Sequence, residues 1–380
     1  MIPTSTRPAF DQDLIIFRDQ VRRFFDRTMT PHLDRWEEEG TVDRSFWNEA
    51  GEAGLLCPTV SPEYGGLGLD FRYNAVVNEE LSYAGSSAGL SLQSDIVANY
   101  IERYGSPEQR RLWLPRMISG EAVTAIAMTE PGAGSDLKGV RTLARRDGDD
   151  YVVSGSKIYI TNGQLADLVV VVAKTDPQAG ARGVSLILVE AGREGFARGR
   201  NLDKVGQRMA DTSELFFNDV RVPTANLLGE EGRGFAYLMA ELPQERLSIA
   251  VSAQACAQRA FDEALAYTKG RSAFGQSVFD FQNTRFTPAG LATKLQVGWA
   301  HLDWALRRHV QGELTTAEAS AAKLFHSELQ GEVCDAALQL HGGAGFMNEY
   351  PIARLWRDAR VTRIYGGTSE IMKEVIGRSL

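Results

Sequence analysis

Residues 124–136 read Thr-Ala-Ile-Ala-Met-Thr-Glu-Pro-Gly-Ala-Gly-Ser-Asp. Small and β-branched residues give way at Glu130 to glycines and a proline, which predicts a strand that enters a turn with exposed backbone N–H groups. A second stretch, Lys157-Ile-Tyr-Ile-Thr-Asn-Gly163, predicts another strand that ends in a turn. N–H donors and the ring of Tyr159 suit the binding of a flat polar ring, although either stretch alone is more often an ordinary strand end.

The sequence around these two stretches divides into three parts. Between residues 121 and 231, short runs rich in valine and isoleucine, such as 168–172 and 184–189, are separated by turn residues. This pattern predicts a β-barrel or sandwich, and no G-x-G-x-x-G opens a helix there, which argues against a parallel dinucleotide-binding sheet. We therefore predict an α+β multidomain fold, with an N-terminal α-helical domain (1–120), a middle β domain (121–231) and a C-terminal four-helix-bundle-like domain (232–380).

Two helices carry predictions that bear on the site. Leu14, Val21 and Phe24 recur at the helical period, and Arg18 and Arg22 are predicted on the opposite, exposed face. In the C-terminal part, Pro243 is predicted to start a long helix that ends near Gly270. This places Glu245 in the first turn of that helix.

Composition limits the class of protein. The 380 residues carry 41 Lys+Arg and 49 Asp+Glu, a net charge of −8, which argues against nucleic acid or an anionic membrane as the main partner. The three scattered cysteines and five histidines show no metal-site spacing, so we expect no metal. The longest apolar run, 168–173, is too short to span a bilayer, and no signal peptide is evident. We expect a cytoplasmic protein with no membrane partner.

Three further motifs lie in the C-terminal part. Arg271 and Phe274 follow the long helix, where the arginine suits a pyrophosphate or simply the helix C-terminus. Residues 339–345 place three glycines after a helix, which suits a close ligand or a plain helix stop. Residues 363–370 lead into a final helix with an N-capping Thr or Ser, and a helix N-terminus beside glycines suits an oxygen ligand.

Together these motifs resemble the acyl-CoA dehydrogenase family of flavoproteins over nearly the whole chain. The resemblance implies bound FAD, with the backbone at Met128 and Thr129 on the flavin ring, and an adenosine-diphosphate half held across a subunit interface. It therefore implies a homotetramer built as a dimer of dimers. The cofactor-binding positions that it implies are Ile126, Met128, Thr129, Ser135, Tyr159, Ile160, Thr161, Arg271, Phe274, Gln282, Gln339, Gly342, Gly343, Thr368 and Glu370. The implied substrate-binding positions are Ser135, Gln244, Arg246 and Gly367.

The catalytic base departs from the commonest pattern of that family. Many members carry a glutamate where this chain has Gly366. A minority, including the isovaleryl and long-chain enzymes, place the base on the long C-terminal helix, at the position of Glu245. The resemblance thus implies that Glu245 is the base, while the backbone N–H of Gly366 still binds the thioester oxygen. The alternative for Glu245 is a first-turn carboxylate that stabilises the helix dipole.

The resemblance implies an enzyme that converts an acyl-CoA thioester to a trans-2-enoyl-CoA and passes electrons to an electron-transferring flavoprotein. One alternative is an acyl-CoA oxidase, which uses O₂, although those proteins are usually much longer. The other is a catalytically silent flavoprotein scaffold. The acyl chain is not determined by spacing in one sequence; members with the relocated base accept long straight or branched chains.

Overall fold

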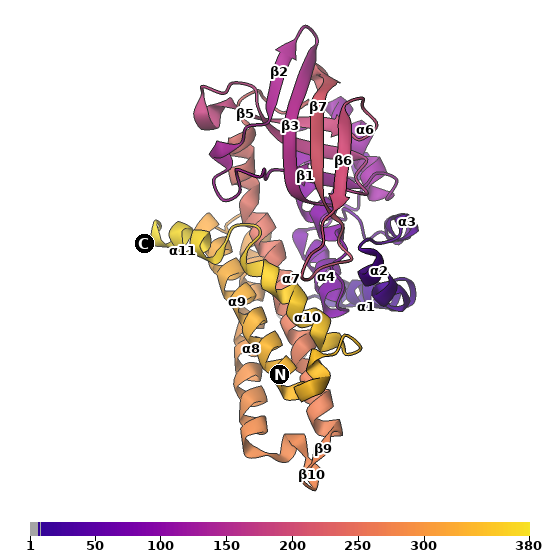
Figure 1. The fold of residues 1–380 in the computed structure, drawn as a ribbon, viewed down its shortest axis with the longest axis vertical. Helices are drawn as coiled ribbons and strands as arrows, with labels where there is room; N and C mark the ends of the chain where they lie inside the picture. Colours follow the sequence, from indigo (N-terminus) through magenta and orange to yellow (C-terminus); the bar gives the residue numbers. More distant parts are fainter. Residues whose placement is uncertain (1–6, 8) are drawn as a thin grey trace.

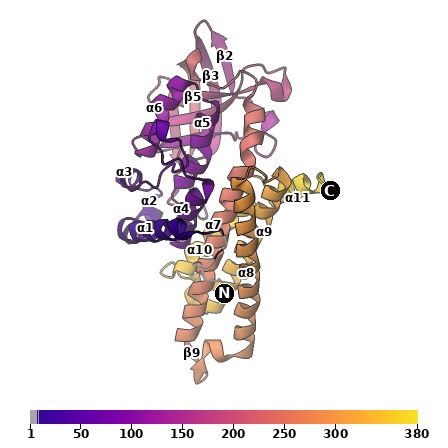
Figure 2. The ribbon, with the colours of Figure 1, turned by 180° about the vertical axis from the view of Figure 1, so that it is seen from behind.

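The computed structural model describes residue 7 and residues 9–380. In chain order the described part is helical, then β-rich, then helical again, and this confirms the predicted α+β architecture. Figure 1 shows the β strands at one end of an elongated molecule and the long helices α7, α8 and α9 running to the other end. The N-terminal helices lie beside the junction of these two parts (Figure 2).

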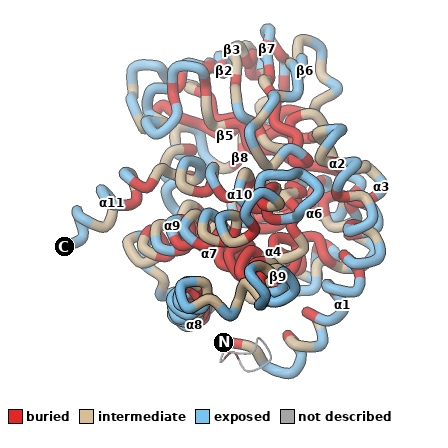
Figure 3. The backbone as a smooth tube through the Cα atoms, turned by 60° about the horizontal axis from the view of Figure 1, so that its bottom comes forward, coloured by how far each residue is buried: buried red, intermediate tan, exposed pale blue. Residues whose placement is uncertain are grey.

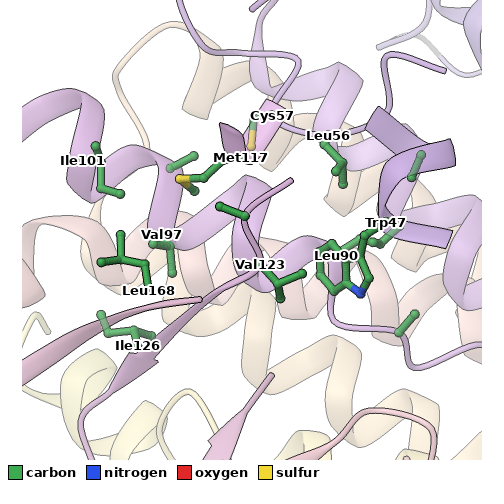
Figure 4. Close-up of a cluster of buried hydrophobic side chains, with 14 of the residues drawn as sticks. Trp47, Leu56, Cys57, Leu90, Val97, Ile101, Met117, Val123, Ile126 and Leu168 are labelled. Carbon is green, nitrogen blue, oxygen red and sulfur yellow. The ribbon is translucent and has the colours of Figure 1, made fainter. Parts of the chain in front are cut away.

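The N-terminal helices surround the largest apolar core. They are α1 (Gln12–Thr28), α2 (Leu33–Glu39), α3 (Arg44–Glu52), α4 (Phe71–Tyr83), a π-turn (Leu92–Val97), α5 (Ala98–Tyr104) and α6 (Pro107–Ile118). Ser106 caps the start of α6 with a capping box that includes Gln109. Figure 4 shows part of the core, where Trp47, Leu90 and Met117 lie near Ile126 and Leu168 of the β domain. The helical and β domains therefore share one apolar core.

The β domain consists of eight paired strands. They are β1 (Thr124–Ala127), β2 (Leu143–Asp147), β3 (Asp150–Thr161), β4 (Leu168–Lys174), β5 (Val184–Glu190), β6 (Phe196–Asn201), β7 (Thr212–Pro223) and β8 (Leu227–Leu228). Their order is β6-β7-β3-β2-β4-β5-β8, and β1 pairs in parallel with β4 outside this path. Alternate residues of these strands, such as Val153, Val171 and Phe217, enclose a second core.

The C-terminal helices form a bundle around α7 (Gly234–Gly270). The other elements are the short strands β9 (Ser272–Ala273) and β10 (Gln276–Ser277), then α8 (Gln282–Val310), α9 (Thr316–His341), α10 (Pro351–Ala359) and α11 (Ser369–Gly377). The middle of α7 and of α4 is buried, whereas α8 presents much of its surface to solvent (Figure 3).

The predicted start of the long helix was wrong. Pro243 lies inside α7, which begins at Gly234, so Glu245 is about three turns into the helix. Proline removes one intrahelical hydrogen bond, but the good helix formers before it and the burial of Leu238 and Leu247 on either side keep the helix continuous. A helix-dipole role for Glu245 is thereby excluded, because the dipole acts only within the first turn.

The predicted exposure of Arg18 was also wrong. Its side chain is buried between α1 and α4, where it pairs with Glu79 and Glu80. Arg22, on the same helix, stays half-exposed and also pairs with Glu80. Two buried carboxylates on α4 require a buried cation, and this requirement outweighs the tendency of arginine to lie at the surface.

Candidate active site

The two motifs with which the sequence analysis began lie side by side. The backbone N–H of Ile158 donates to the carbonyl of Thr129 at 3.0 Å, and the Thr129 hydroxyl donates back to the carbonyl of Ile158. Beneath them, the buried Lys157 ammonium donates to Glu130 at 2.8 Å and to the Met128 carbonyl at 3.1 Å. Glu130 also accepts from the backbone of Arg141 and Thr142, so the turn after β1 is fixed on β3.

This surface fits a flat polar ring. Within the described chain, the backbone N–H groups of Met128 and Thr129 donate to no carbonyl, and both residues are only half-buried. Beside them, Tyr159 adopts a φ of 63° and leaves its side chain 67% exposed. Free N–H donors and an outward aromatic ring at a β-bulge of β3 suit a flat polar ring such as the isoalloxazine of FAD.

The other predicted residues of this surface differ in accessibility. Ser135 is exposed in the glycine-rich turn, and Thr161 is half-buried at the end of β3. Ile126 and Ile160 are buried, with their side chains in the apolar cores. Only backbone atoms of these two isoleucines are therefore available to a ligand.

Glu245 is buried where α7 packs against α5. Its side chain is buried, and Oε1 accepts a hydrogen bond of 2.9 Å from the Tyr100 hydroxyl. Burial raises the pKa of Glu245 to about 7; the Tyr100 hydrogen bond and the Arg246 cation lower it, and the Glu241 carboxylate, one turn earlier, raises it. A carboxyl group with a pKa near neutrality is suited to accept a proton.

The turn at Gly366 packs on the same stretch of α7. Gly366 has a φ of 62°, and a Cβ at this position would lie 2.2 Å from Cδ1 of Ile249, one turn beyond Glu245. A glutamate at 366 is therefore disfavoured twice, by backbone strain and by contact with α7. The N–H of Gly366 donates to no acceptor among the described residues, so it remains free for a ligand.

Two buried cations flank this turn. The ammonium of Lys323 on α9 donates to the Gly367 carbonyl at 2.6 Å, and burial lowers the pKa of Lys323 to about 8. Arg246 donates to Ser320 at 3.0 Å while its buried Nε has no partner among the described residues. A Cβ on Gly367 would lie 3.9 Å from Nη2 of Arg246. The structure thus places Arg246 and Gly367 together, as the sequence predicts for a substrate site.

Gln244 is occupied by structural contacts. Its amide NH₂ donates to the carbonyl of Asp95 at 2.6 Å, and its oxygen lies 2.9 Å from Nε2 of His309. Burial lowers the pKa of His309 to about 4, so the neutral ring donates to the amide oxygen. Both ends of Gln244 are used, and its predicted contact with substrate needs these bonds to rearrange.

The predicted adenosine-diphosphate positions lie at the far end of the bundle. Arg271 and Phe274 sit where α7 meets the β9–β10 hairpin, and stacking of Tyr267 on His341 at 4.4 Å brings the end of α9 beside them. The positions exposed there are Arg271, Phe274, Gln282, Gln339, Gly342 and Gly343. Arg271 is roughly 40 Å along the α7 axis from Glu245, as the place of β9 in Figure 1 illustrates. In one chain these residues do not lie near Met128 or Tyr159.

Thr368 and Glu370 lie at the start of α11, near the Gly366 turn. The Thr368 hydroxyl caps the helix by accepting from the N–H of Ile371, as the sequence predicts. Glu370 is exposed, and its hydrogen bonds at the helix start lower its pKa. The buried Ser369 hydroxyl has no partner among the described residues.

Sequence reasoning missed three residues at this site: Tyr100, Lys323 and Lys157, the lysine that pairs with Glu130. The signals were weak, because a tyrosine or lysine within a helix or strand is ordinary until its partner is known. A cavity of about 310 Å³ lies elsewhere, between α1, α4 and α10. Its arginines, Arg22 and Arg354 among them, already pair with carboxylates, and none of the predicted site residues lines it.

In the part of the chain that the structure describes, no helix is long and apolar enough to cross a membrane. Three family models match the chain: the acyl-CoA dehydrogenase N-terminal domain over residues 11–121, the middle domain over 125–220 and the C-terminal domain over 232–380. The long-chain specific acyl-CoA dehydrogenase of Sus scrofa mitochondria is 50% identical, over 98% of this chain and 88% of that protein.

Solved structures agree with these matches. The acyl-CoA dehydrogenase from Geobacillus kaustophilus is 49% identical and superposes with a TM-score of 0.97, covering 98% of this chain and 99% of its own. A glutaryl-CoA dehydrogenase from Mycobacterium smegmatis in complex with FADH2 is 30% identical with a TM-score of 0.93, covering 98% of this chain and 96% of its own.

Proposed function

Because the chain belongs to the acyl-CoA dehydrogenase family, whose activity is the FAD-dependent dehydrogenation of acyl-CoA, we propose that Glu245 is its catalytic base. The observation that carries the proposal is a buried carboxyl group with a pKa near 7 beside the Gly366 turn. Glu245 removes the proton from the carbon next to the thioester, and the product is a trans-2-enoyl-CoA.

The residues around the base divide the remaining work. Bound FAD would supply the acceptor for the hydride that leaves the β-carbon. The free N–H of Gly366 binds the thioester oxygen and stabilises the negative charge that develops when the proton leaves. Arg246 and Gly367 hold the substrate near Ser320 and Lys323. Burial of Glu245 raises its pKa toward that of a useful base.

The test is anaerobic mixing with a saturated long-chain acyl-CoA, followed by flavin absorbance. We expect the wild type to bleach the flavin, and Glu245→Gln to retain FAD and ligand but bleach about 10² to 10⁴ times more slowly. Glu263→Gln, on the same helix but paired with Arg259, is the control and should bleach normally. A wild-type rate for Glu245→Gln would exclude this residue as the base; no bleaching by the wild type would favour the scaffold. Oxygen consumption in air, equal to substrate used, would favour the oxidase.

We further propose that the cofactor spans two subunits of a homotetramer, and that an electron-transferring flavoprotein reoxidises it. The support for the shared cofactor is the distance within one chain between the Arg271 cluster and the Met128 surface. Division of the chain at residues 120 and 231 is part of the proposal, since no helix or strand crosses either point. A cytoplasmic location fits the three free, buried cysteines, whereas the pig relative is mitochondrial.

Arg271→Ala tests the shared cofactor. Loss of charge-assisted hydrogen bonds to a pyrophosphate should weaken FAD binding about tenfold or more and lower the oligomeric state. The flavin-to-protein ratio after gel filtration, with light scattering for mass, measures both. Arg111→Ala, a change at an exposed arginine of α6, is the control. An unchanged ratio for Arg271→Ala would contradict the assignment.

A further inference from the structure

Tyr100 is the only side chain that the described structure bonds to the Glu245 carboxyl group. It comes from α5, and its hydroxyl donates to Oε1 of Glu245 at 2.9 Å. The ring is fully buried, and burial together with the Glu245 carboxylate raises the pKa of Tyr100 well above its ordinary value. The hydroxyl therefore keeps its proton and remains a donor at any physiological pH.

The two carboxyl oxygens of Glu245 are in different situations. Oε1 is engaged by Tyr100, whereas no donor among the described residues reaches Oε2. Oε2 does not belong to the fully buried side-chain atoms that lack a hydrogen-bond partner. Part of its surface is therefore solvent-accessible. A rotation that turned both oxygens away from the Tyr100 hydroxyl would break the one hydrogen bond that the described residues give this carboxyl group. The hydroxyl thus distinguishes the two oxygens.

The position of Tyr100 is fixed by contacts to the same stretch of α7. A π-turn (Leu92–Val97) directly precedes α5, and its Asp95 carboxylate accepts from Asn74 at 2.9 Å and from the Ser248 hydroxyl. Gln244 donates to the Asp95 carbonyl. Gln244 and Ser248 flank Glu245 in sequence, so the residues on either side of the base anchor the segment that carries Tyr100. π-turns inside helices frequently mark functional sites.

Charged groups on four elements lie around the stretch of α7 that carries Glu245. On α7 they are Glu241 and Arg246, and on α5 Arg103 and Tyr104 bind Glu241 at 3.1 and 2.7 Å. Asp95 of the π-turn is held by its own donors, and Lys323 of α9 points to the Gly367 carbonyl. Among the described residues, none of these groups forms a hydrogen bond with the Glu245 carboxyl group; Tyr100 does.

We propose that Tyr100 is a positioning residue for proton abstraction: its hydroxyl holds Oε1 of Glu245 and leaves Oε2 as the oxygen that takes the α-proton. The inference rests on the proposed role of Glu245 and specifies it. When Oε2 takes the proton from the substrate carbon, Glu245 becomes a neutral acid, and Tyr100 keeps its own proton and its bond to Oε1.

The test compares Tyr100→Phe with the wild type in two measurements. The first is the infrared band of the protonated Glu245 carboxyl group, identified by its absence in Glu245→Gln and titrated without substrate. The second is the pH dependence of anaerobic flavin bleaching. Because the tyrosine stabilises the charged carboxylate, its loss should move both midpoints upward by about one pH unit. Misorientation of the base should slow bleaching about tenfold at high pH.

The matched control is Tyr83→Phe. The Tyr83 hydroxyl also donates to a carboxylate of α7, Asp262, at 2.9 Å, but farther along the helix. It should leave both midpoints unchanged. If Tyr100→Phe titrates at the wild-type pH in both measurements, while Glu245→Gln is inactive, the role of Tyr100 is overturned whatever its rate. If Glu245→Gln still bleaches normally, the proposed base itself is wrong.

Discussion

Glu130 and Glu245 are two buried glutamates, one in the turn after β1 and one in the middle of α7, and their pKa values are shifted in opposite directions. Glu130 faces the Lys157 ammonium and two backbone N–H groups, which outweigh burial and lower its pKa. Glu245 faces a phenol and another carboxylate, and burial raises its pKa to about 7. Burial opposes the charged form of both groups, but a cation and two N–H donors outweigh it at Glu130, whereas at the more deeply desolvated Glu245 it prevails.

Of the changes that test this contrast, removal of the Lys157 ammonium should have the largest effect on the free energy of unfolding. Lys157→Met leaves Glu130 charged and buried without its partner, and we expect a loss of about 3–5 kcal/mol in the free energy of unfolding. Urea unfolding followed by circular dichroism measures the loss. Lys373→Met, at an exposed lysine of α11, is the control. A loss below 1 kcal/mol would mean that Glu130 does not need its lysine.

A smaller effect should appear in how the free energy of unfolding depends on pH, because Glu245 titrates differently in the folded and unfolded chain. The pKa of Glu245 is raised from 4.5 in the unfolded chain to about 7 in the folded one, so folding disfavours its charged form. The wild type therefore loses stability from this group as pH rises from 4.5 to 7, up to about 3 kcal/mol. Glu245→Gln lacks this loss.

Urea unfolding of both proteins at pH 5 and pH 8 measures the difference. Glu245→Gln should gain stability relative to the wild type at the higher pH. Parallel changes in the two proteins would show that Glu245 has an ordinary pKa, and the contrast with Glu130 would then disappear.

The smallest effect should come from a glutamate that is not buried. Glu263 pairs with Arg259 at 2.7 Å across one turn of α7, and both side chains are partly exposed. Solvent screens such a pair, so Glu263→Gln should change the free energy of unfolding by about 0.5 kcal/mol or less. A change of 2 kcal/mol or more would show that position on α7, rather than burial, controls these carboxyl groups.

Much of the fold followed from local pattern. The strand–turn signals at 124–136 and 157–163 and the cap at Thr368 each involve residues a few positions apart, and each is present. The start of α7 was not predictable in this way, because proline is compatible with a helix start and only packing on both sides keeps the helix continuous through Pro243. Arg18 was misplaced for a similar reason, since its partners lie on another helix.

The sequence by itself determined the three-part architecture, the glycine-rich turns and the glutamate available on α7, because these depend on periodicity and on residues with special backbone preferences. Only the tertiary structure decided that Glu245 is buried, that Tyr100 reaches it from 145 positions away, and that Gly366 packs against the next turn of the same helix. The reason is physical: the protonation of a carboxyl group depends on its solvent and its neighbours in space, and folding brings these together from distant parts of the chain.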